Sequence, residues 1–333
     1  MWLSIPAAGQ HARVVVDYTA NAMPSRVDSN SPAFWRDGKF NLINSAGVPF
    51  ITSGTDQILI YQGKPVESEI EASPHFPMWI EAAWQDEDGV LYAWYHHEPG
   101  GVCPGTALTA PEIGALVSTD GGASFTDLGI VLSSGDQLNC STRNVFFAGG
   151  HGDFSVILDQ EKRYFYFVFD NYGGAASSQG VAMARMAFRD RAKPVGAVWK
   201  HYRNFWREPG LGGRLSPFLT AKTSWEQEHS DSFWGPSIHW NTYLKTYVAL
   251  LNHACCSPTW PQEGIYVTFN RDLRNPDGWT SPQRILSADE IGFSPGFYPQ
   301  VLGLGPEETD TLSGRVARLY VKGFARWKIY FDP

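Results

Sequence analysis

Polar side chains recur at the openings of short apolar segments that lie far apart in the sequence. They are Asp28, Asn30, Glu81, His151, Asp153, Asp231, His239 and Gln300. Carboxylates and imidazoles act as proton donors and acceptors in general acid–base catalysis, and charged side chains are rarely buried unless they are paired or used. If the fold brings these segments together, the carboxylates could supply the proton donor and the second carboxylate that cleavage of a glycosidic bond requires.

The segments that carry these residues follow one repeated pattern. Each copy has a polar or Pro-containing turn, a short apolar strand, a second turn and an aromatic-rich strand. The copies open near residues 30, 79, 152, 234 and 298, and further strands at 57–61, 114–118, 180–184 and 264–268 follow several of them. Each unit therefore holds three or four antiparallel strands. The sequence predicts an all-β fold in which residues 1–333 form a single domain, a five-bladed β-propeller.

A propeller places the first strand of each blade along the central axis, so the polar residues that open the repeats should converge on one axial pocket. We expect residues 12–16 to pair with residues 327–331 and close the ring. The segment 118–125 has the Asp-box spacing Ser-x-Asp-x-Gly-x-x-aromatic, a hairpin turn common in sialidases and other propellers. Its Asp120 can accept hydrogen bonds from the backbone of its own turn, so we interpret it as a marker of the fold.

The repeat resembles the five-bladed glycoside hydrolases of family 43 over nearly the whole chain. The resemblance implies a general base in the first blade, before a Pro-containing strand, an orienting Asp in the third blade, and an acid in a Glu-Gly-Pro motif of the fourth. Asp153 matches the blade-three position. Asp28 lies upstream of the expected base position, which falls near Asn30, and Trp234 stands before Gly235 where the acid is expected.

The missing Glu leaves the proton donor to be found elsewhere. Glu81 lies between Trp79 and Trp84, and an aromatic, desolvated setting raises the pKa of a carboxyl group. We therefore expect Asp28 to act as base, Glu81 as acid and Asp153 as the orienting residue. Asp231 and Glu263 are alternative donors. For each carboxylate, the competing interpretation is a hydrogen-bonded residue that anchors a blade turn.

Several further residues are candidates for substrate binding. Trp79 and Trp234 stand beside the polar turns, and aromatic faces stack well on sugar rings. The expected polar contacts come from Asn30, His151, His239 and Gln300, with Arg214 available to a carboxylated sugar. No paired spacing of ligands marks a metal site, and no cofactor is required. Some related propellers hold a Ca²⁺ ion near the axis, so a structural Ca²⁺ ion is a further expectation here.

Three other functions fit parts of the same pattern. A non-catalytic carbohydrate-binding propeller is suggested by Trp234 at the acid position. A sialidase-like enzyme is suggested by the Asp-box, although Arg26, Arg143 and Arg214 do not assemble into an arginine triad. A polysaccharide lyase that uses His and Tyr is the third alternative.

Composition argues against a nucleic-acid or membrane partner, and the expected partner is a carbohydrate substrate. The net charge of -8 carries no basic runs, which argues against a nucleic-acid partner. No apolar run has the length of about 18 residues that a membrane span needs. Residues 1–9 lack the features of a signal peptide, so we expect a cytoplasmic protein as given, or an exported one with its leader already removed. Cys103, Cys140, Cys255 and Cys256 are expected to be free thiols.

Overall fold

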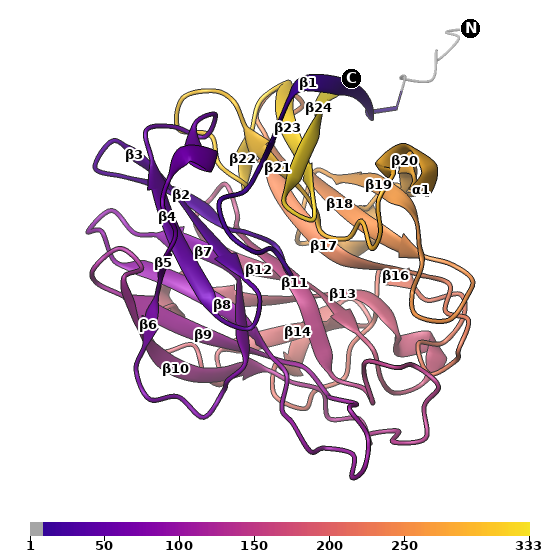
Figure 1. Ribbon diagram of the computed structural model, residues 1–333. Helices are drawn as coiled ribbons and strands as arrows, with labels where there is room; N and C mark the ends of the chain where they lie inside the picture. Colours follow the sequence, from indigo (N-terminus) through magenta and orange to yellow (C-terminus); the bar gives the residue numbers. More distant parts are fainter. Residues whose placement is uncertain (1–8) are drawn as a thin grey trace, which may run out of the picture.

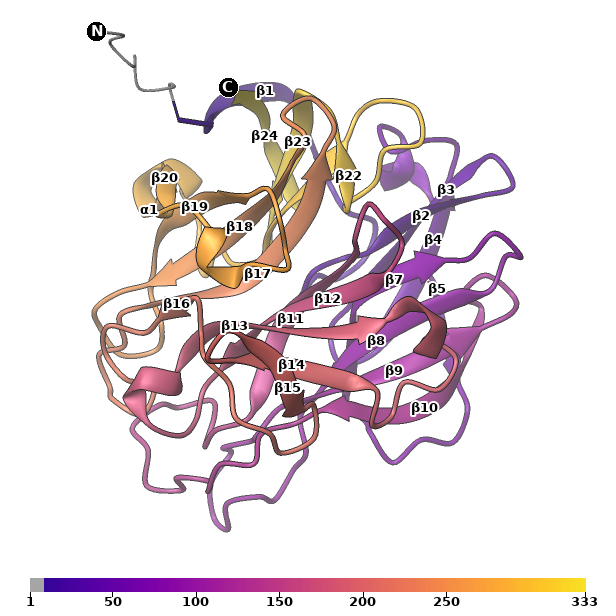
Figure 2. The same cartoon turned by 180° about the vertical axis from the view of Figure 1, so that it is seen from behind.

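The computed structural model describes residues 9–333, which form five β-sheets arranged around a central axis (Figures 1 and 2). The fold is the five-bladed β-propeller that the repeat predicted. Blades 1 to 5 are named here in the order of their innermost strands, β2, β7, β11, β17 and β21.

The first two blades are built from neighbouring parts of the chain. Blade 1 contains β2 (Ala33–Arg36), β3 (Lys39–Ser45), β4 (Pro49–Gly54) and β5 (Val66–Glu67), with the 3-10 helix η1 (Ile60–Gln62) before β5. Blade 2 contains β7 (Met78–Gln85), β8 (Leu91–His97), β9 (Glu112–Ser118) and β10 (Ser124–Leu132), and β6 (Glu69–Ile70) pairs with β10.

The sheets of blades 2, 3 and 4 have five, six and five strands, more than the three or four expected for each unit. Blade 3 contains β11 (His151–Leu158), β12 (Tyr164–Asn171), β13 (Gly180–Ala187), β14 (Val198–Tyr202), β15 (Phe205–Pro209) and β16 (Leu219–Thr220), with the 3-10 helices η2 (Ala176–Ser178) and η3 (Phe188–Asp190). Blade 4 contains β17 (Ser232–Asn241), β18 (Thr246–Ala254), β19 (Gln262–Asn270), β20 (Gln283–Ser287) and β22 (Leu312–Ser313), with η4 (Pro276–Gly278) and α1 (Ala288–Ile291). The added strands are short edge pairings that cover backbone groups at the rim of each sheet.

Blade 5 joins the two ends of the chain, as the sequence predicted. It contains β21 (Pro299–Gly303), β23 (Val316–Val321), β24 (Phe324–Asp332) and β1 (His11–Ala22). Val14 pairs with Ile329 and Val15 with Lys328 in antiparallel register. Figure 1 shows the indigo β1 beside the yellow β24. This pairing closes the ring between the first and last parts of the described chain.

The blades are held together by one apolar cluster at each interface between neighbours. Representative buried residues, in the order of the interfaces 1–2, 2–3, 3–4, 4–5 and 5–1, are Phe34 and Ile80, Trp94 and Phe167, Tyr166 and Ile238, Leu250 and Leu319, and Tyr320 and Phe40. Aromatic and branched residues suit such packing because they fill the space between twisted sheets. The aromatic-rich second strand of each repeat is thus mostly core.

The cysteines are not free thiols, so that expectation was wrong. Cys103 pairs with Cys140 across a sequence separation of 37 residues, with Cα atoms 5.4 Å apart, and Cys255 pairs with its neighbour Cys256. Spacing alone did not reveal the first pair because the two loops that carry it come together only in the folded propeller. Among the described residues, no helix has the length and apolar character of a membrane span.

Candidate functional site

An axial pocket of about 390 Å³ opens where β7, β11 and β17 begin. Its walls combine carboxylates with aromatic rings, as in many sites for small ligands. The lining residues used below are Asp28, Trp79, Glu98, Phe147, Asp153, Trp234, Trp260, Tyr298 and Lys322. Of the three predicted catalytic residues, Asp28 and Asp153 line this pocket, and Glu81 lies buried behind Asp153.

Two of the carboxylates reach their positions through β-bulges. The register of β7 shifts between Ile80 and Ala82, which leaves Glu81 as the extra residue, and that of β11 shifts between Gly152 and Phe154, which leaves Asp153. Asp153 has a φ of 38°, in the left-handed region that is uncommon for residues other than glycine. A bulge turns a side chain away from the regular alternation of a strand, and bulges are frequent beside functional sites. The two bulges thus bring the carboxylates together at one level of the axis.

Glu81, His96 and Asp153 form a buried cluster in which all ligand atoms lie within 4.8 Å of one another. Glu81 Oε2 accepts a hydrogen bond from the Phe154 N–H at 3.0 Å, and Glu81 Oε1 lies 3.3 Å from His96 Nδ1. His96 Nε2 lies 3.2 Å from a carboxylate oxygen of Glu98. The cluster therefore connects a fully buried acid to one at the pocket wall.

A proton must lie between Glu81 Oε1 and His96 Nδ1, because two lone pairs would otherwise face each other. Burial raises the pKa of Glu81 to about 7, with the charge of Asp153 adding to the effect. Burial lowers the pKa of His96, but hydrogen bonds to Glu81 and Glu98 outweigh it and raise the pKa. The Asp153 N–H donates to His96 Nδ1 at 3.1 Å, which requires a free lone pair on that nitrogen. We therefore favour the geometry with the proton on Glu81.

Asp153 lines the pocket and is nevertheless almost fully buried. Burial raises its pKa, and its Oδ2 accepts a hydrogen bond from the Tyr172 hydroxyl. Behind it, Asp170 accepts a hydrogen bond from the Gly235 N–H at 2.7 Å, and burial raises the pKa of Asp170 well above its ordinary value. This concentration of acids favours protonated carboxyl groups at the floor of the pocket.

The mouth of the pocket carries an ion pair and a buried tyrosine. Asp28 pairs with Lys322, whose Nζ lies 5.2 Å from the centre of the Tyr298 ring. Burial raises the pKa of Tyr298 well above its ordinary value, and the charges of Asp153, Asp28, Glu81 and Glu98 raise it further. Tyr298 therefore lies among all four carboxylates and acts as a neutral hydroxyl.

Aromatic rings form the remaining wall. The ring centres of Phe147 and Tyr172 are 4.4 Å apart, those of Trp225 and Trp260 are 4.2 Å apart, and those of Trp234 and Trp260 are 5.4 Å apart. Trp79 lines the opposite side and packs edge-on against His96. Trp79 and Trp234 are therefore at the pocket, as expected for residues that contact a sugar.

Two of the other predicted binding residues fasten the blades to one another. The Asn30 side-chain amide donates to the Phe154 and Pro236 carbonyls at 2.8 Å each. Gln300 donates to the Ser31 carbonyl at 2.8 Å and accepts from the Ser31 N–H at 2.6 Å. The polar groups of both side chains are largely used inside the protein.

The remaining predicted binding residues do not line the axial pocket. His151 is buried against Phe169, and burial lowers its pKa well below the ordinary value. His239 is buried against Phe331, and burial lowers its pKa to about 3. Both are core histidines in the described structure. Arg214 is exposed and pairs with Glu208 at 2.6 Å, so the expected contact with a carboxylated sugar has no support in its position.

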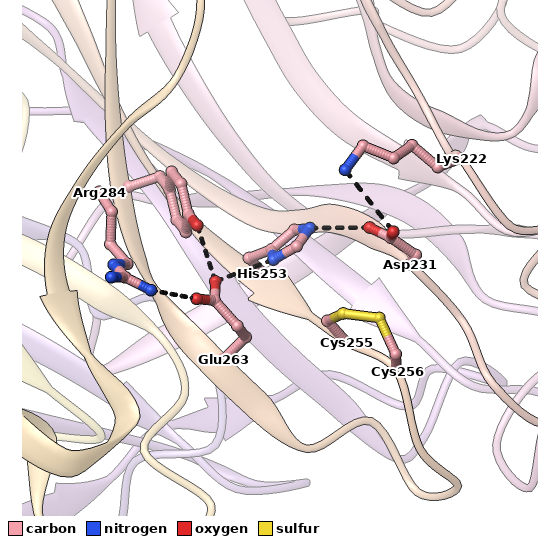
Figure 3. Close-up of a disulfide and its surroundings, with 8 residues drawn as sticks. Lys222, Asp231, His253, Cys255, Cys256, Glu263 and Arg284 are labelled. Carbon is pink, nitrogen blue, oxygen red and sulfur yellow. Dashed lines mark hydrogen bonds and ion pairs between the residues drawn. A yellow bond between two sulfur atoms is a disulfide. The ribbon is translucent and has the colours of Figure 1, made fainter.

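The alternative donors Asp231 and Glu263 lie together around a different histidine. His253 Nε2 lies 3.0 Å from Asp231 Oδ1, and His253 Nδ1 lies 3.0 Å from Glu263 Oε2 (Figure 3). Arg284 pairs with Glu263, and the Cys255–Cys256 disulfide lies beside this group in the same view. Neither carboxylate lines the axial pocket, because both are held by charge partners in blade 4.

Sequence reasoning missed Glu98, Tyr172, Tyr298 and Lys322 as site residues. Glu98 is the first residue after β8, and Tyr298 is the last residue before β21. Their positions at strand ends were the one sequence feature that could have marked them as site residues. Lys322 lies in the tight turn between β23 and β24, which no motif distinguishes.

Glu81, His96 and Asp153 could also hold a cation. The donor set has two carboxylates and one imidazole, fewer oxygens than the six to eight or so that Ca²⁺ prefers. Two of the carboxylate oxygens already accept protein hydrogen bonds. The expected structural Ca²⁺ stays a prediction, and this cluster is a poor match for it.

Comparison with known proteins gives a similarity of fold. No family model matches the sequence, and no curated protein matches it. An endo-arabinase from Bacteroides thetaiotaomicron superposes with a TM-score of 0.56 at 13% identity, over 94% of this chain and 96% of that one. An exo-β-1,3-galactanase from Phanerochaete chrysosporium, solved with β-1,3-galactotriose, gives a TM-score of 0.52 at 11% identity over 96% of this chain.

This chain spans 64% of that galactanase. An α-L-arabinofuranosidase of family 62 from Coprinopsis cinerea gives a TM-score of 0.50 at 8% identity, over 92% of this chain and 90% of that one. The chain therefore has the five-bladed β-propeller fold found in glycoside hydrolases of families 43 and 62.

Proposed function

We propose that the protein is a glycoside hydrolase that cleaves a neutral sugar in the axial pocket. The observation that carries this proposal is the pair of bulge residues, Glu81 and Asp153, whose buried carboxyl groups have raised pKa values at the floor of an aromatic pocket. A carboxyl group that keeps its proton near neutral pH can donate it to a leaving group. The fold shared with known glycosidases supports the same assignment.

The roles of the carboxylates follow from which of them touch the pocket. Asp153 lines the pocket and has a raised pKa, so we assign it as the proton donor in place of the buried Glu81. Burial raises the pKa of Asp153, and the charges of Glu98 and Asp28 add to the effect. Glu81 accepts the N–H of the next residue, Phe154, and so helps to position Asp153. Asp28 at the mouth is the second carboxylate, which activates water or attacks the sugar carbon. Trp79, which is only partly buried, supplies a face for the ring, whereas Trp234 and Trp260 line the pocket but are 2% and 5% exposed.

The charge of the pocket favours a neutral substrate. Asp28, Glu98 and Asp153 line it together with the single cation Lys322, which already pairs with Asp28. No arginine lines it within the described residues 9–333, so the arginine triad of a sialidase is not formed there. A carboxylated sugar would meet net repulsion.

The test compares leaving groups in single variants. Asp153→Asn should lower kcat about 100-fold or more on natural glycosides, and much less on aryl glycosides whose leaving group needs no proton. Asp28→Asn should lower turnover on both kinds of substrate. Asp37→Asn is the matched control, because this exposed residue lies on the outer turn of blade 1. Equal losses for Asp153→Asn on both substrates would contradict its role as donor.

A second function is favoured by Trp234. This tryptophan is 2% exposed and occupies the position where the resemblance implies an acid, which suits a propeller that binds a carbohydrate without cleaving it. In that case the wild-type protein should bind oligosaccharides by calorimetry and release no reducing sugar from any of them. Measurable turnover that Asp153→Asn abolishes would exclude this alternative.

A further inference from the structure

A second hollow lies at the opposite end of the strands that form the axial pocket. The near ends of β7, β11 and β17 place Trp79, Asp153 and Trp234 at the axial pocket. The far ends of the same strands, which can be followed in Figure 2, place Trp84, Leu158 and Trp240 around a separate cavity of about 340 Å³. From Asp153 to Leu158 the strand advances roughly 16 Å, at about 3.3 Å per residue. The two hollows are therefore separate.

A smaller cavity of about 120 Å³ adjoins the far cavity. Asp159, Gln160 and Trp240 line both, and the two cavities together are named here the distal groove. The larger cavity alone falls in the size range of small-molecule sites.

The walls of the distal groove offer flat apolar faces and unused hydrogen-bonding groups. Trp84 and Trp240 are only partly buried there, unlike most tryptophans of the core. Trp94 Nε1 and Asp159 Oδ2 have no hydrogen-bond partner, although Trp94 is 2% and Asp159 is 5% exposed. The other oxygen of Asp159 is occupied, since it accepts the Arg163 N–H at 2.6 Å. Buried polar atoms are rarely left unpaired, so these two groups point to a ligand with hydroxyls.

The charges in the larger cavity favour a neutral ligand. Its lining holds one carboxylate, Asp159, and one ammonium group, Lys162. Lys162 is already paired with Glu87 at 3.0 Å. An anion would therefore find no free cation in the larger cavity. The smaller cavity adds two residues of each sign, Glu161, Asp272, Arg271 and Arg274, of which Asp272 and Arg274 pair with each other at 2.8 Å.

We propose that the distal groove is a second binding site, which holds a segment of a neutral oligosaccharide. Sugar rings stack on Trp84 and Trp240, and their hydroxyls accept from Trp94 Nε1 and donate to Asp159 Oδ2. The site performs no chemistry. It holds a polymer chain on the face of the propeller opposite the axial pocket, and it needs no catalysis in that pocket.

The test uses the full chain and titrates tri- and hexasaccharides of galactose, arabinose and xylose by calorimetry. Asp153→Asn serves as the background, because it should slow consumption of the oligosaccharides about 100-fold or more. Adding Trp240→Ala should weaken binding of at least one oligosaccharide at the distal groove about ten-fold or more, equivalent to about 1.4 kcal/mol. Trp199→Ala is the matched control, because this exposed tryptophan lies on β14 outside both hollows.

A second variant separates binding from folding. Asp159→Asn keeps an oxygen for the Arg163 N–H and replaces the free oxygen by a donor, so it should weaken binding with little change in stability. In the otherwise wild-type protein, Trp240→Ala should leave turnover of small aryl glycosides unchanged. If both variants bind every oligosaccharide as tightly as Trp199→Ala does, the distal groove is not a sugar site. This outcome is independent of whether the axial pocket hydrolyses anything.

Discussion

Single carboxyl groups decide what the axial pocket can do. Burial raises the pKa of both Glu81 and Asp153, and the nearby charge of Asp153 raises that of Glu81 further. Pairs of this kind separate in pKa and so provide one protonated group at neutral pH. The exposed Asp28, which pairs with Lys322, has a different environment. Because their surroundings differ, one carboxyl group at the floor of the pocket, Asp153, could donate a proton while another at the mouth, Asp28, acts as the second carboxylate.

The raised pKa of Glu81 predicts a dependence of stability on pH. The folded protein binds this proton more tightly than the unfolded chain, in which the pKa is near 4.5, whereas it is about 7 when folded. The contribution of Glu81 to the free energy of unfolding is therefore complete below the unfolded pKa and is lost as pH rises toward about 7. Glu81→Gln cannot ionise and keeps an acceptor for the Phe154 N–H.

Urea denaturation at about pH 5 and about pH 8 checks this prediction. Between the two values, the wild type should lose more stability than Glu81→Gln does. Glu87→Gln, at an exposed position, should follow the wild type. Identical pH slopes for the wild type and Glu81→Gln would show that Glu81 ionises normally in the folded state.

At the scale of elements, loops build one wall of the axial pocket and a disulfide fixes them. The loop after β8 carries Glu98 and Cys103, and the loop before β11 carries Cys140 and Phe147. Loops without strand partners are usually the most mobile parts of a domain. The Cys103–Cys140 bond ties these two loops to each other. The pocket wall is thus defined by a covalent link as well as by packing.

Removing this disulfide should destabilise the protein and loosen the wall. We expect Cys103→Ser with Cys140→Ser to lower the free energy of unfolding by about 2 to 5 kcal/mol and to weaken oligosaccharide binding in the axial pocket. Each single substitution should cost about as much as the double one, because the bond needs both sulfurs. Denaturation and calorimetry measure the two effects. Additive losses from the single variants would mean that the two cysteines act independently.

At the scale of the whole molecule, amide side chains at the axis connect blades to one another, and that of Asn30 joins blades that are not neighbours. Asn30 connects blade 1 to the backbones of blades 3 and 4, and Gln300 connects blade 5 to blade 1. Neighbouring blades share apolar clusters, whereas the contacts of Asn30 cross the ring.

The hydrogen bonds of Asn30 predict a large loss of stability from a nearly isosteric substitution. Asn30→Asp removes two buried donors and places an acceptor against the Phe154 and Pro236 carbonyls, so stability at neutral pH should fall by about 2 to 5 kcal/mol. Asn30→Ala should cost less, since it leaves the carbonyls unpaired without adding a charge. Thermal denaturation gives the order of the variants. If Asn30→Asp is as stable as the wild type but binds sugar weakly, Asn30 is a substrate contact after all.

The sequence by itself determined the repeat, and with it the number of blades and the closing strand at residues 12–16. It also predicted that Asp28, Glu81 and Asp153 lie at one end of the axis. Periodic patterns are local, and each repeat shows the same alternation of turn and strand. The aromatic setting of Glu81 was also visible, because Trp79 and Trp84 are its close neighbours in sequence.

Only the tertiary structure decided which polar residues face the pocket and which face the core. Asn30, His151 and Gln300 lie at or before the starts of inner strands, near the level of Asp153, but a single bulge changes the side on which a residue emerges. His239 lies near the far end of β17, which the repeat pattern did not reveal. Tyr298, Lys322 and the partners of the cysteines come from loops and turns, whose positions depend on contacts between distant segments. Such contacts leave no period in the sequence, so the fold was predictable and the lining of its pocket was not.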